Sequence, residues 1–411
     1  MDRLAHLRGL NVAQRAAVEY GVSDIAGADV SGPLLVIAGA GTGKTSTLAH
    51  RAVHLIVTGR PPERILLLTF TRRAATEMTR RAQRILSTVW AAAKSGAVGA
   101  VGEISWSGTF HAIGNRLLRE YADSIGLDPS FTILDRADAA DRLNLVRNDL
   151  GLAKMEARFP RKETCLAIYS HAVNACCPLA DALESAFPWC AEWESELKML
   201  FRGYVEAKQR DNVLDYDDLL LYWAHMMDEP ALARLVAEQF DHVLVDEYQD
   251  TNSLQAQIVL RMKPDGRGLA VVGDDAQSIY SFRAATVRNI LDFPKQFTPP
   301  AHIVTLEQNY RSTEPILHSW RAVEYRKGQS TSDSRNSPRL RATSSAWARS
   351  TTRPDRLNTS GTRSTWAAGS SRGSRRLLCR SGNRSAMTMW CVLTAAIAAR
   401  LCDGTSASAT V

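Results

Sequence analysis

A glycine-rich segment near the N-terminus constrains the fold more than any other feature of the sequence. Residues 38–45 read Ala-Gly-Ala-Gly-Thr-Gly-Lys-Thr, and they stand between an apolar run at 34–37 and a helical pattern at 45–57. A turn of this kind surrounds phosphate oxygens with backbone N–H groups at the positively polarised end of the helix. The segment therefore predicts a phosphate-binding loop within an α/β fold.

The residue types of this loop indicate how it would hold ATP. Glycine permits a close approach to the phosphates and backbone angles that a side chain would forbid. Lys44 is expected to reach the β- and γ-phosphates, and the Thr45 hydroxyl is expected to bind Mg²⁺. The residues predicted to line the cofactor are Ala38, Gly39, Ala40, Gly41, Thr42, Gly43, Lys44 and Thr45.

A second motif supplies the acidic groups that such a loop needs. The apolar run at 242–245 is followed directly by Asp246 and Glu247. Asp246 suits a Mg²⁺ ligand, and Glu247 suits the general base that orients an attacking water. Acidic pairs at strand ends are common, so this pair is informative mainly because the phosphate-binding loop accompanies it.

Apolar patterning predicts the remaining architecture. Strands of one parallel sheet are expected at 65–70, 242–245, 269–272 and 303–306. Between them, over about 116–239, the pattern is helical and rich in Leu and Ala, which predicts an all-helical insertion into the α/β domain. Three tryptophans of this stretch are expected in its core rather than on a binding surface. They are Trp189, Trp193 and Trp223.

The acidic motif also carries a family resemblance. Residues 246–252, Asp-Glu-Tyr-Gln-Asp-Thr-Asn, together with the phosphate-binding loop, closely resemble the UvrD/Rep/PcrA-like superfamily 1 DNA helicases. Other segments resemble motifs of that family in the family's order, at 10–15, 69–75, 108–111, 215–220, 273–280 and 307–312. The resemblance covers roughly residues 10–317 and implies an α/β fold of the P-loop NTPase type, with a RecA-like parallel sheet and an all-helical inserted subdomain.

The same resemblance implies roles for single residues around ATP and Mg²⁺. Gln14 would read the adenine and Tyr310 would stack on it. Gln277 would sense the γ-phosphate, and Arg311 would contact it. The implied catalytic residues are Glu247, Lys44, Gln277 and Arg311, and the implied metal ligands are Thr45 and Asp246.

Single-stranded DNA, and its junctions with duplex DNA, are the partners that the resemblance implies. Proteins grip single strands by stacking bases on aromatic rings, with basic contacts to the backbone. The family usually has Trp where Phe282 stands, so stacking there is expected to be weaker. The segment at 110–111 is equally compatible with a packed corner of the core. The residues expected to contact DNA are Phe70, Arg72, Arg73, Phe110, His111, Tyr280, Phe282 and Arg283.

The charge of the chain is divided unevenly. The formal net charge is +7, yet residues 1–318 hold 34 basic and 39 acidic residues. Residues 319–411 hold the other 16 basic and 4 acidic residues. Bulk basicity is therefore no argument for DNA binding, which depends on a local groove.

The basic segment at 319–411 has two interpretations. It is either an Arg/Ser-rich disordered tail that binds nucleic acid or an out-of-frame translation of a second motor domain. Composition favours the second interpretation, because fifteen arginines accompany a single lysine, Lys327, and four tryptophans occur without periodicity. On that interpretation ATP hydrolysis is expected to be slow and unwinding absent, because the second motor domain would complete the site.

These observations combine into one expected organisation. Residues 1–115 and 240–306 would form the first motor domain, with 116–239 inserted, 307–318 opening a second motor domain, and the tail beyond. The expected function is an ATP-dependent DNA helicase, implied by the family to move 3′→5′. The alternatives are a non-catalytic ATP- and DNA-binding fragment, or the helicase part of a helicase–nuclease.

Cysteine usage and hydropathy predict a cytoplasmic protein. The seven cysteines form no CxxC pair and no Cys/His zinc spacing, and no signal segment opens the chain. No apolar run approaches the roughly 20 residues that a membrane span needs, so no membrane partner is expected.

Overall fold

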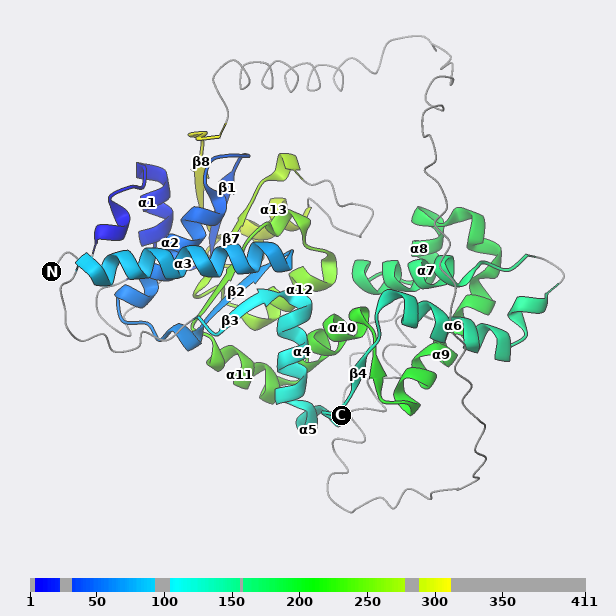
Figure 1. Ribbon diagram of the computed structural model, residues 1–411. Helices are drawn as coiled ribbons and strands as arrows, with labels where there is room; N and C mark the ends of the chain where they lie inside the picture. The colour runs from blue at the N-terminus through cyan, green and yellow to red at the C-terminus, as the bar shows by residue number, and fades with distance from the viewer. Residues whose placement is uncertain (1–3, 23–31, 93–103, 156–157, 278–287, 312–411) are drawn as a thin grey trace, which may run out of the picture. The chain divides into compact units, whose positions relative to one another are not determined.

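A six-stranded, fully parallel sheet organises the residues that the computed structural model describes, namely 4–22, 32–92, 104–155, 158–277 and 288–311 (Figure 1). Its strand order is β3-β2-β6-β7-β1-β8. The strands are β1 (Leu34–Ala38), β2 (Ile65–Thr69), β3 (Trp106–Thr109), β6 (His242–Val245), β7 (Leu269–Gly273) and β8 (His302–Leu306). The predicted α/β fold with a parallel sheet is thus confirmed.

Helices cover both faces of this sheet, which explains why its strands are apolar on both sides. Alternate residues of a strand point to opposite faces, so Leu34 and Val36 enter one core while Leu35 enters the other. The first core also takes side chains from α1 (Val12–Glu19), α2 (Lys44–Val57) and α3 (Arg72–Ala92). The second takes them from α4 (Phe110–Glu120), α10 (Tyr216–Met226), α11 (Pro230–Gln239) and α12 (Ser253–Met262).

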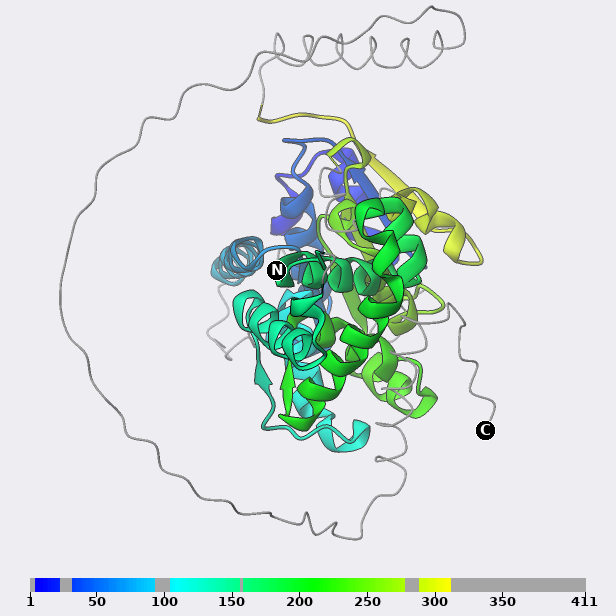
Figure 2. The ribbon, with the colours of Figure 1, turned by 90° about the vertical axis from the view of Figure 1, so that its right-hand side faces the viewer.

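A group of helices between β3 and β6 packs largely on itself (Figures 1 and 2). It consists of α6 (Arg136–Asp149), α7 (Lys162–Ala175), α8 (Leu179–Ala186) and α9 (Glu194–Arg210). Two short helices, α5 (Ala122–Ile125) and α13 (Arg288–Asp292), complete the set of α-helices in the described residues. Within those residues no helix is both long enough and apolar enough to cross a membrane.

The helical group is joined to the sheet domain through a pair of very short parallel strands. β4 (Thr132–Ile133) precedes α6, β5 (Val213–Leu214) follows α9, and the two pair directly. This pair is the exception to the all-helical pattern expected for residues 116–239. Each strand has only two residues, which is too short for an alternating pattern to show in the sequence.

The strands expected at 34–37, 65–70, 242–245, 269–272 and 303–306 and the helix expected at 45–57 lie within one residue of their predicted bounds, whereas two other expectations differ from the structure. The strand β3, whose sequence is Trp-Ser-Gly-Thr, was not expected because it contains no apolar run. Trp193 and Trp223 are buried as predicted, whereas the prediction for Trp189 is wrong, because its side chain is 67% exposed. Trp189 makes an edge-to-face contact with Phe187 instead of entering the core.

A buried charge cluster fixes α9 against the start of α10. The Lys208 ammonium donates hydrogen bonds to Asp215 (2.7 Å) and Asp218 (2.8 Å), and the Tyr204 hydroxyl donates to Asp215 (2.8 Å). Burial opposes the charge of Lys208, but the two carboxylates hold its pKa well above the ordinary value. Lys208 contributes to the stability of the fold chiefly because its removal would leave the negative charge of two buried carboxylates without a compensating cation.

We predict that Lys208→Met lowers the free energy of unfolding by about 3–5 kcal/mol, because both carboxylates would then be buried without a cation. Urea unfolding followed by circular dichroism measures the change. Arg210→Met on the same helix is the control, since the Arg210 side chain is 72% exposed and its change should stay within about 0.5 kcal/mol. Equal effects of the two substitutions would contradict this account of the cluster.

Candidate functional site

A cavity of about 400 Å³ lies at the carboxyl edge of the sheet, where β1 gives way to α2. β1 pairs with β7 on one side and with β8 on the other, so the loop that follows β1 starts from an interior strand of the sheet. The cavity brings together most of the residues that the sequence singled out for the cofactor. They are Gly39, Ala40, Gly41, Gly43, Lys44, Thr45, Glu247, Gln277 and Arg311.

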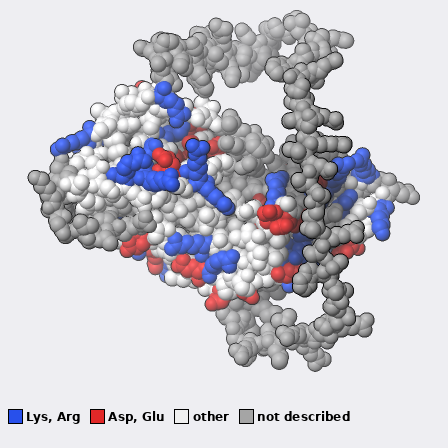
Figure 3. Space-filling model, in the orientation of Figure 1, with Lys and Arg blue, Asp and Glu red and all other residues white. Residues whose placement is uncertain are grey.

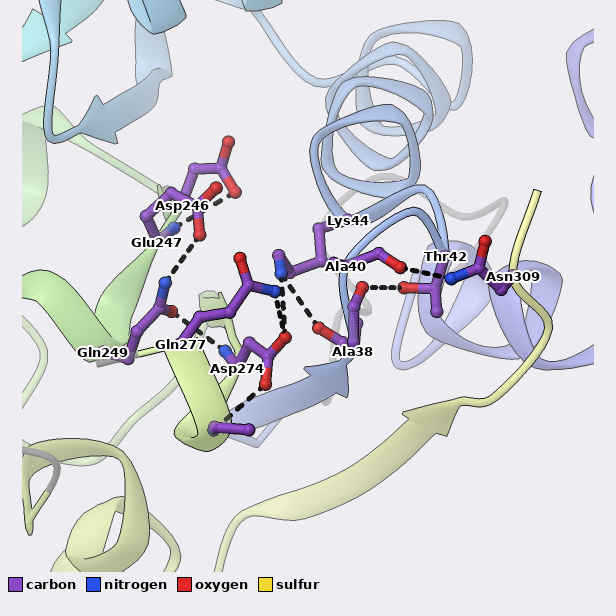
Figure 4. Close-up of polar contacts among 12 residues, drawn as sticks. Ala38, Ala40, Thr42, Lys44, Asp246, Glu247, Gln249, Asp274, Gln277 and Asn309 are labelled. Atoms are coloured by element: carbon purple, nitrogen blue, oxygen red, sulfur yellow. Dashed lines mark hydrogen bonds and ion pairs between the residues drawn. The ribbon is translucent and has the colours of Figure 1, made fainter. Parts of the chain in front are cut away.

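The backbone of the loop takes the form that a phosphate cradle requires. Gly43 has φ 91° immediately before α2, and a Cβ there would lie 2.9 Å from Nε2 of Gln14. Thr42 donates its hydroxyl to the Gly39 carbonyl (2.8 Å), which closes the turn. The Lys44 ammonium donates to the Ala38 carbonyl (3.0 Å) and pairs with Asp274 (3.4 Å). The lysine is therefore held beside the loop (Figure 4).

The acidic pair follows β6, which lies two strands away from β1. Asp246 is buried and accepts a hydrogen bond from the Thr45 hydroxyl. Burial and, to a smaller extent, the Glu247 carboxylate raise the pKa of Asp246 to about 6, while the Thr45 hydrogen bond opposes the rise. Glu247 has φ 51° and ψ 46°, a left-handed conformation that is uncommon for a residue with a side chain. The structure thus places the two expected metal ligands in contact and Glu247 on the cavity wall.

The residues expected at the adenine lie on the other side of the loop. Gln14 donates to the Thr42 carbonyl (3.0 Å), and its side-chain oxygen accepts from the backbone N–H of Asn11 (3.1 Å). The Tyr310 hydroxyl accepts from the Asn11 side chain (2.9 Å), and the Tyr310 backbone N–H donates to Gly41 (2.9 Å). Gln14 and Tyr310 are therefore neighbours, connected through Asn11.

The residues present fit ATP with Mg²⁺. The amino end of α2 and the cationic side chains of Lys44, Arg73, Arg81 and Arg311 surround the space that the phosphates would fill. The Thr45 hydroxyl and the Asp246 carboxylate are hard oxygen donors of the kind that Mg²⁺ prefers. The shape of the loop and its donor set agree with the cofactors expected from the sequence.

A second, larger cavity of about 680 Å³ lies at the carboxyl ends of β2 and β3, and we call it the groove. Phe70, Arg72 and His111 line it, and His111 makes an edge-to-face contact with Tyr216. Phe110 also borders it but is only 2% exposed and packs on Trp223, as the packing interpretation predicted. The expected DNA residues Tyr280, Phe282 and Arg283 lie outside the described residues.

The two neighbouring arginines at the start of α3 face different cavities. Arg72 lines the groove, whereas Arg73 lines the phosphate cavity beside Lys44. α3 carries five arginines and one glutamate, and Figure 3 shows basic side chains gathered over this helix around an acidic one. Adjacent helical positions point about 100° apart, which explains the separation.

Sequence reasoning missed three polar residues that connect parts of the site. Gln249 and Asp274 bridge the ends of β6 and β7, and Asn309 donates to the Ala40 carbonyl of the loop (2.6 Å). All three lie within segments that the sequence singled out, yet none was given a role. Their position directly beyond the ends of buried strands was the available indication.

We predict a pH-dependent stability difference between the metal-free protein and its Asp246→Asn variant. Because the pKa of Asp246 rises from 3.8 to about 6 on folding, its ionisation destabilises the native state as the pH rises through 6. Asparagine cannot ionise, so the variant should gain relative stability between pH 4 and pH 7, by up to about 3 kcal/mol. Urea unfolding in EDTA measures this, and a difference that stays constant with pH would contradict it.

Comparisons with known proteins agree with this geometry. The family model described as UvrD/REP helicase N-terminal domain matches residues 13–298. The chain is 38% identical over 317 residues to the ATP-dependent DNA helicase PcrA of Leuconostoc citreum, covering 77% of this chain and 39% of that protein. It is 34% identical over 315 residues to the ATP-dependent DNA helicase PcrA of Bacillus subtilis (strain 168), covering 76% of this chain and 39% of that protein.

The chain spans about two fifths of the length of these relatives. The matched region contains the phosphate-binding loop, the acidic pair after β6 and all of the residues that line the groove. The chain belongs to the UvrD/REP helicase family and carries that family's N-terminal domain.

Proposed function

We propose that this chain binds ATP with Mg²⁺ in the phosphate cavity and hydrolyses it as the ATP-binding part of a DNA helicase. Movement along single-stranded DNA and duplex unwinding would need the second motor domain that residues 307–318 are expected to open. The observation that carries the proposal is the convergence of Lys44, Thr45, Asp246, Glu247 and Gln277 at one edge of the sheet. The neighbouring groove supports the DNA part of the proposal, because it joins aromatic and basic side chains.

The hydrolysis step follows from the chemistry of these side chains. Lys44 holds the β- and γ-phosphates, while Thr45 and Asp246 hold the metal. Bound Mg²⁺ supplies positive charge that neutralises the charge developing on the phosphate oxygens. Glu247 orients the attacking water and accepts its proton, and Gln277 and Arg311 contact the γ-phosphate.

DNA binding is proposed for the groove, with single strands and their junctions with duplex as partners. Phe70 and His111 offer ring faces or edges to the bases, and Arg72 offers a contact to the backbone. The position of Arg73 supports a role at the phosphates of ATP instead of the expected DNA contact.

The division of the chain into domains remains part of the proposal. Residues 1–115 and 240–306 would form one motor domain, 116–239 an inserted subdomain, and 307–318 the start of a second motor domain. A cytoplasmic location is likewise proposed, supported by the free cysteines Cys165, Cys176, Cys177 and Cys190.

We predict that Lys44→Ala removes DNA-stimulated ATP turnover, by about 100-fold or more, because the phosphates lose their closest cation. Phosphate release with and without single-stranded DNA measures turnover, and equilibrium binding of a fluorescent ATP analogue measures affinity. The control is Lys198→Ala, whose lysine pairs with Glu194 on α9. Nucleotide binding without any DNA-stimulated turnover in the unaltered chain would favour the non-catalytic alternative.

The two arginines of α3 give a separate prediction for DNA. Arg72→Ala should weaken binding of a single-stranded oligonucleotide and lower the salt dependence of its affinity by about one ion, because one backbone contact is lost. Arg73→Ala should leave the affinity of the nucleotide-free protein for DNA unchanged, since Arg73 faces the other cavity. Fluorescence anisotropy over a series of salt concentrations measures both, and equal losses would contradict the division.

A further inference from the structure

Gln249 is a buried side chain in direct contact with the proposed general base. It lies in the 3-10 turn Tyr248–Asp250 and is 1% exposed. Its amide nitrogen donates to Oε2 of Glu247 (2.7 Å), and its amide oxygen accepts from the backbone N–H of Asp274 (2.9 Å). One side chain therefore joins the acidic pair after β6 to the first residue after β7 (Figure 4).

The chemistry of its partners fixes which way the Gln249 amide points. The backbone N–H of Asp274 can only donate, so the amide oxygen must face it. The NH₂ group is then left to face Glu247, where a carboxylate accepts a hydrogen bond that is stronger than a neutral one. The two contacts are mutually consistent, and a flipped amide would lose both.

The space for this contact depends on the last residue of β7. A Cβ at Gly273 would lie 2.7 Å from Oε1 of Gln249 and 2.6 Å from the Ile290 side chain. A glycine at position 273 therefore lets the Gln249 side chain reach Asp274, at the carboxyl end of β7, without displacing Ile290.

Asp274, the residue that Gln249 contacts after β7, is itself connected to the phosphate cavity. The Asp274 carboxylate pairs with the Lys44 ammonium (3.4 Å) and accepts a hydrogen bond from the Gln277 amide. Gln249 thus ties Glu247 to the residue that holds both Lys44 and Gln277. Its backbone-anchored amide restrains Glu247, whose own backbone is in the left-handed region.

We propose that Gln249 is a positioning residue for ATP hydrolysis, which fixes the carboxylate of Glu247 relative to Lys44 and Gln277 at the phosphate cavity. The inference rests on the proposed function, because it assigns Glu247 its role as the base. Gln249 acts through Glu247, because Glu247 lines the phosphate cavity and Gln249 does not. Loss of its amide hydrogen bond changes the rate of the chemical step and leaves ATP affinity in place.

The test measures single-turnover and steady-state phosphate release by the full chain with saturating single-stranded DNA. Gln249→Met removes the donor and keeps the length of the side chain, and it should lower kcat by about 10- to 100-fold with KM for ATP unchanged. Gln249→Glu keeps the shape and the contact to Asp274 but sets a carboxylate against Glu247, and its kcat should be at least as low. Gln239→Met, at the end of α11, is the matched control.

A combined variant separates positioning from packing. In a Glu247→Gln background, adding Gln249→Met should lower kcat no further, because both changes act on one group. Thermal unfolding of each variant verifies that it is folded, and a kcat that falls only in proportion to the folded fraction overturns the inference.

The outcomes distinguish this inference from the proposed function. If Glu247→Gln lowers kcat while Gln249→Glu and Gln249→Met do not, Gln249 only packs and this inference alone fails. If the unaltered chain shows no turnover that depends on Lys44, the proposed function fails and the role of Gln249 fails with it.

Discussion

The turn between β1 and α2 determines where every other group of the site can act. Because β1 lies between β7 and β8, this turn emerges from the interior of the carboxyl edge, where side chains from several strands can reach it. Gly43 makes the turn possible through its positive φ, and α2 then starts directly at Lys44. Asn309, Gln14 and Asp246 each reach this turn or the first residues of α2, so it serves as their common frame.

Much of the sheet could be predicted because its strands carry their own local pattern. Buried parallel strands read as continuous apolar runs, and β1, β2, β6 and β7 do so, while the edge strand β8 still keeps Ile303, Val304 and Leu306 as a recognisable apolar pattern. β3, at the other edge of the sheet, does not, because it places one large apolar residue, Trp106, beside Ser107, Gly108 and Thr109.

The site was predictable to the level of segments, and less so to the level of single side chains. Glu247 could be grouped with Lys44 in advance because a phosphate-binding loop needs acidic groups for its metal and its attacking water, whereas Gln277 was grouped with them only through the family resemblance. The separation of Arg72 from Arg73 depends on how α3 is rotated about its axis, which packing decides. The bridge through Gln249 depends on the distance between the ends of β6 and β7, which only the folded sheet defines.

The short β4–β5 pair has a consequence for how the chain folds. It brings the two ends of the helical group together, so the chain enters the group at β4 and leaves it at β5, directly beside β4. Once α6 to α9 have formed, the stretch between β3 and β6 behaves as a much shorter connection, and closing it costs less chain entropy. Two residues on each strand thereby hold the two ends of a long inserted segment together beside the parallel sheet.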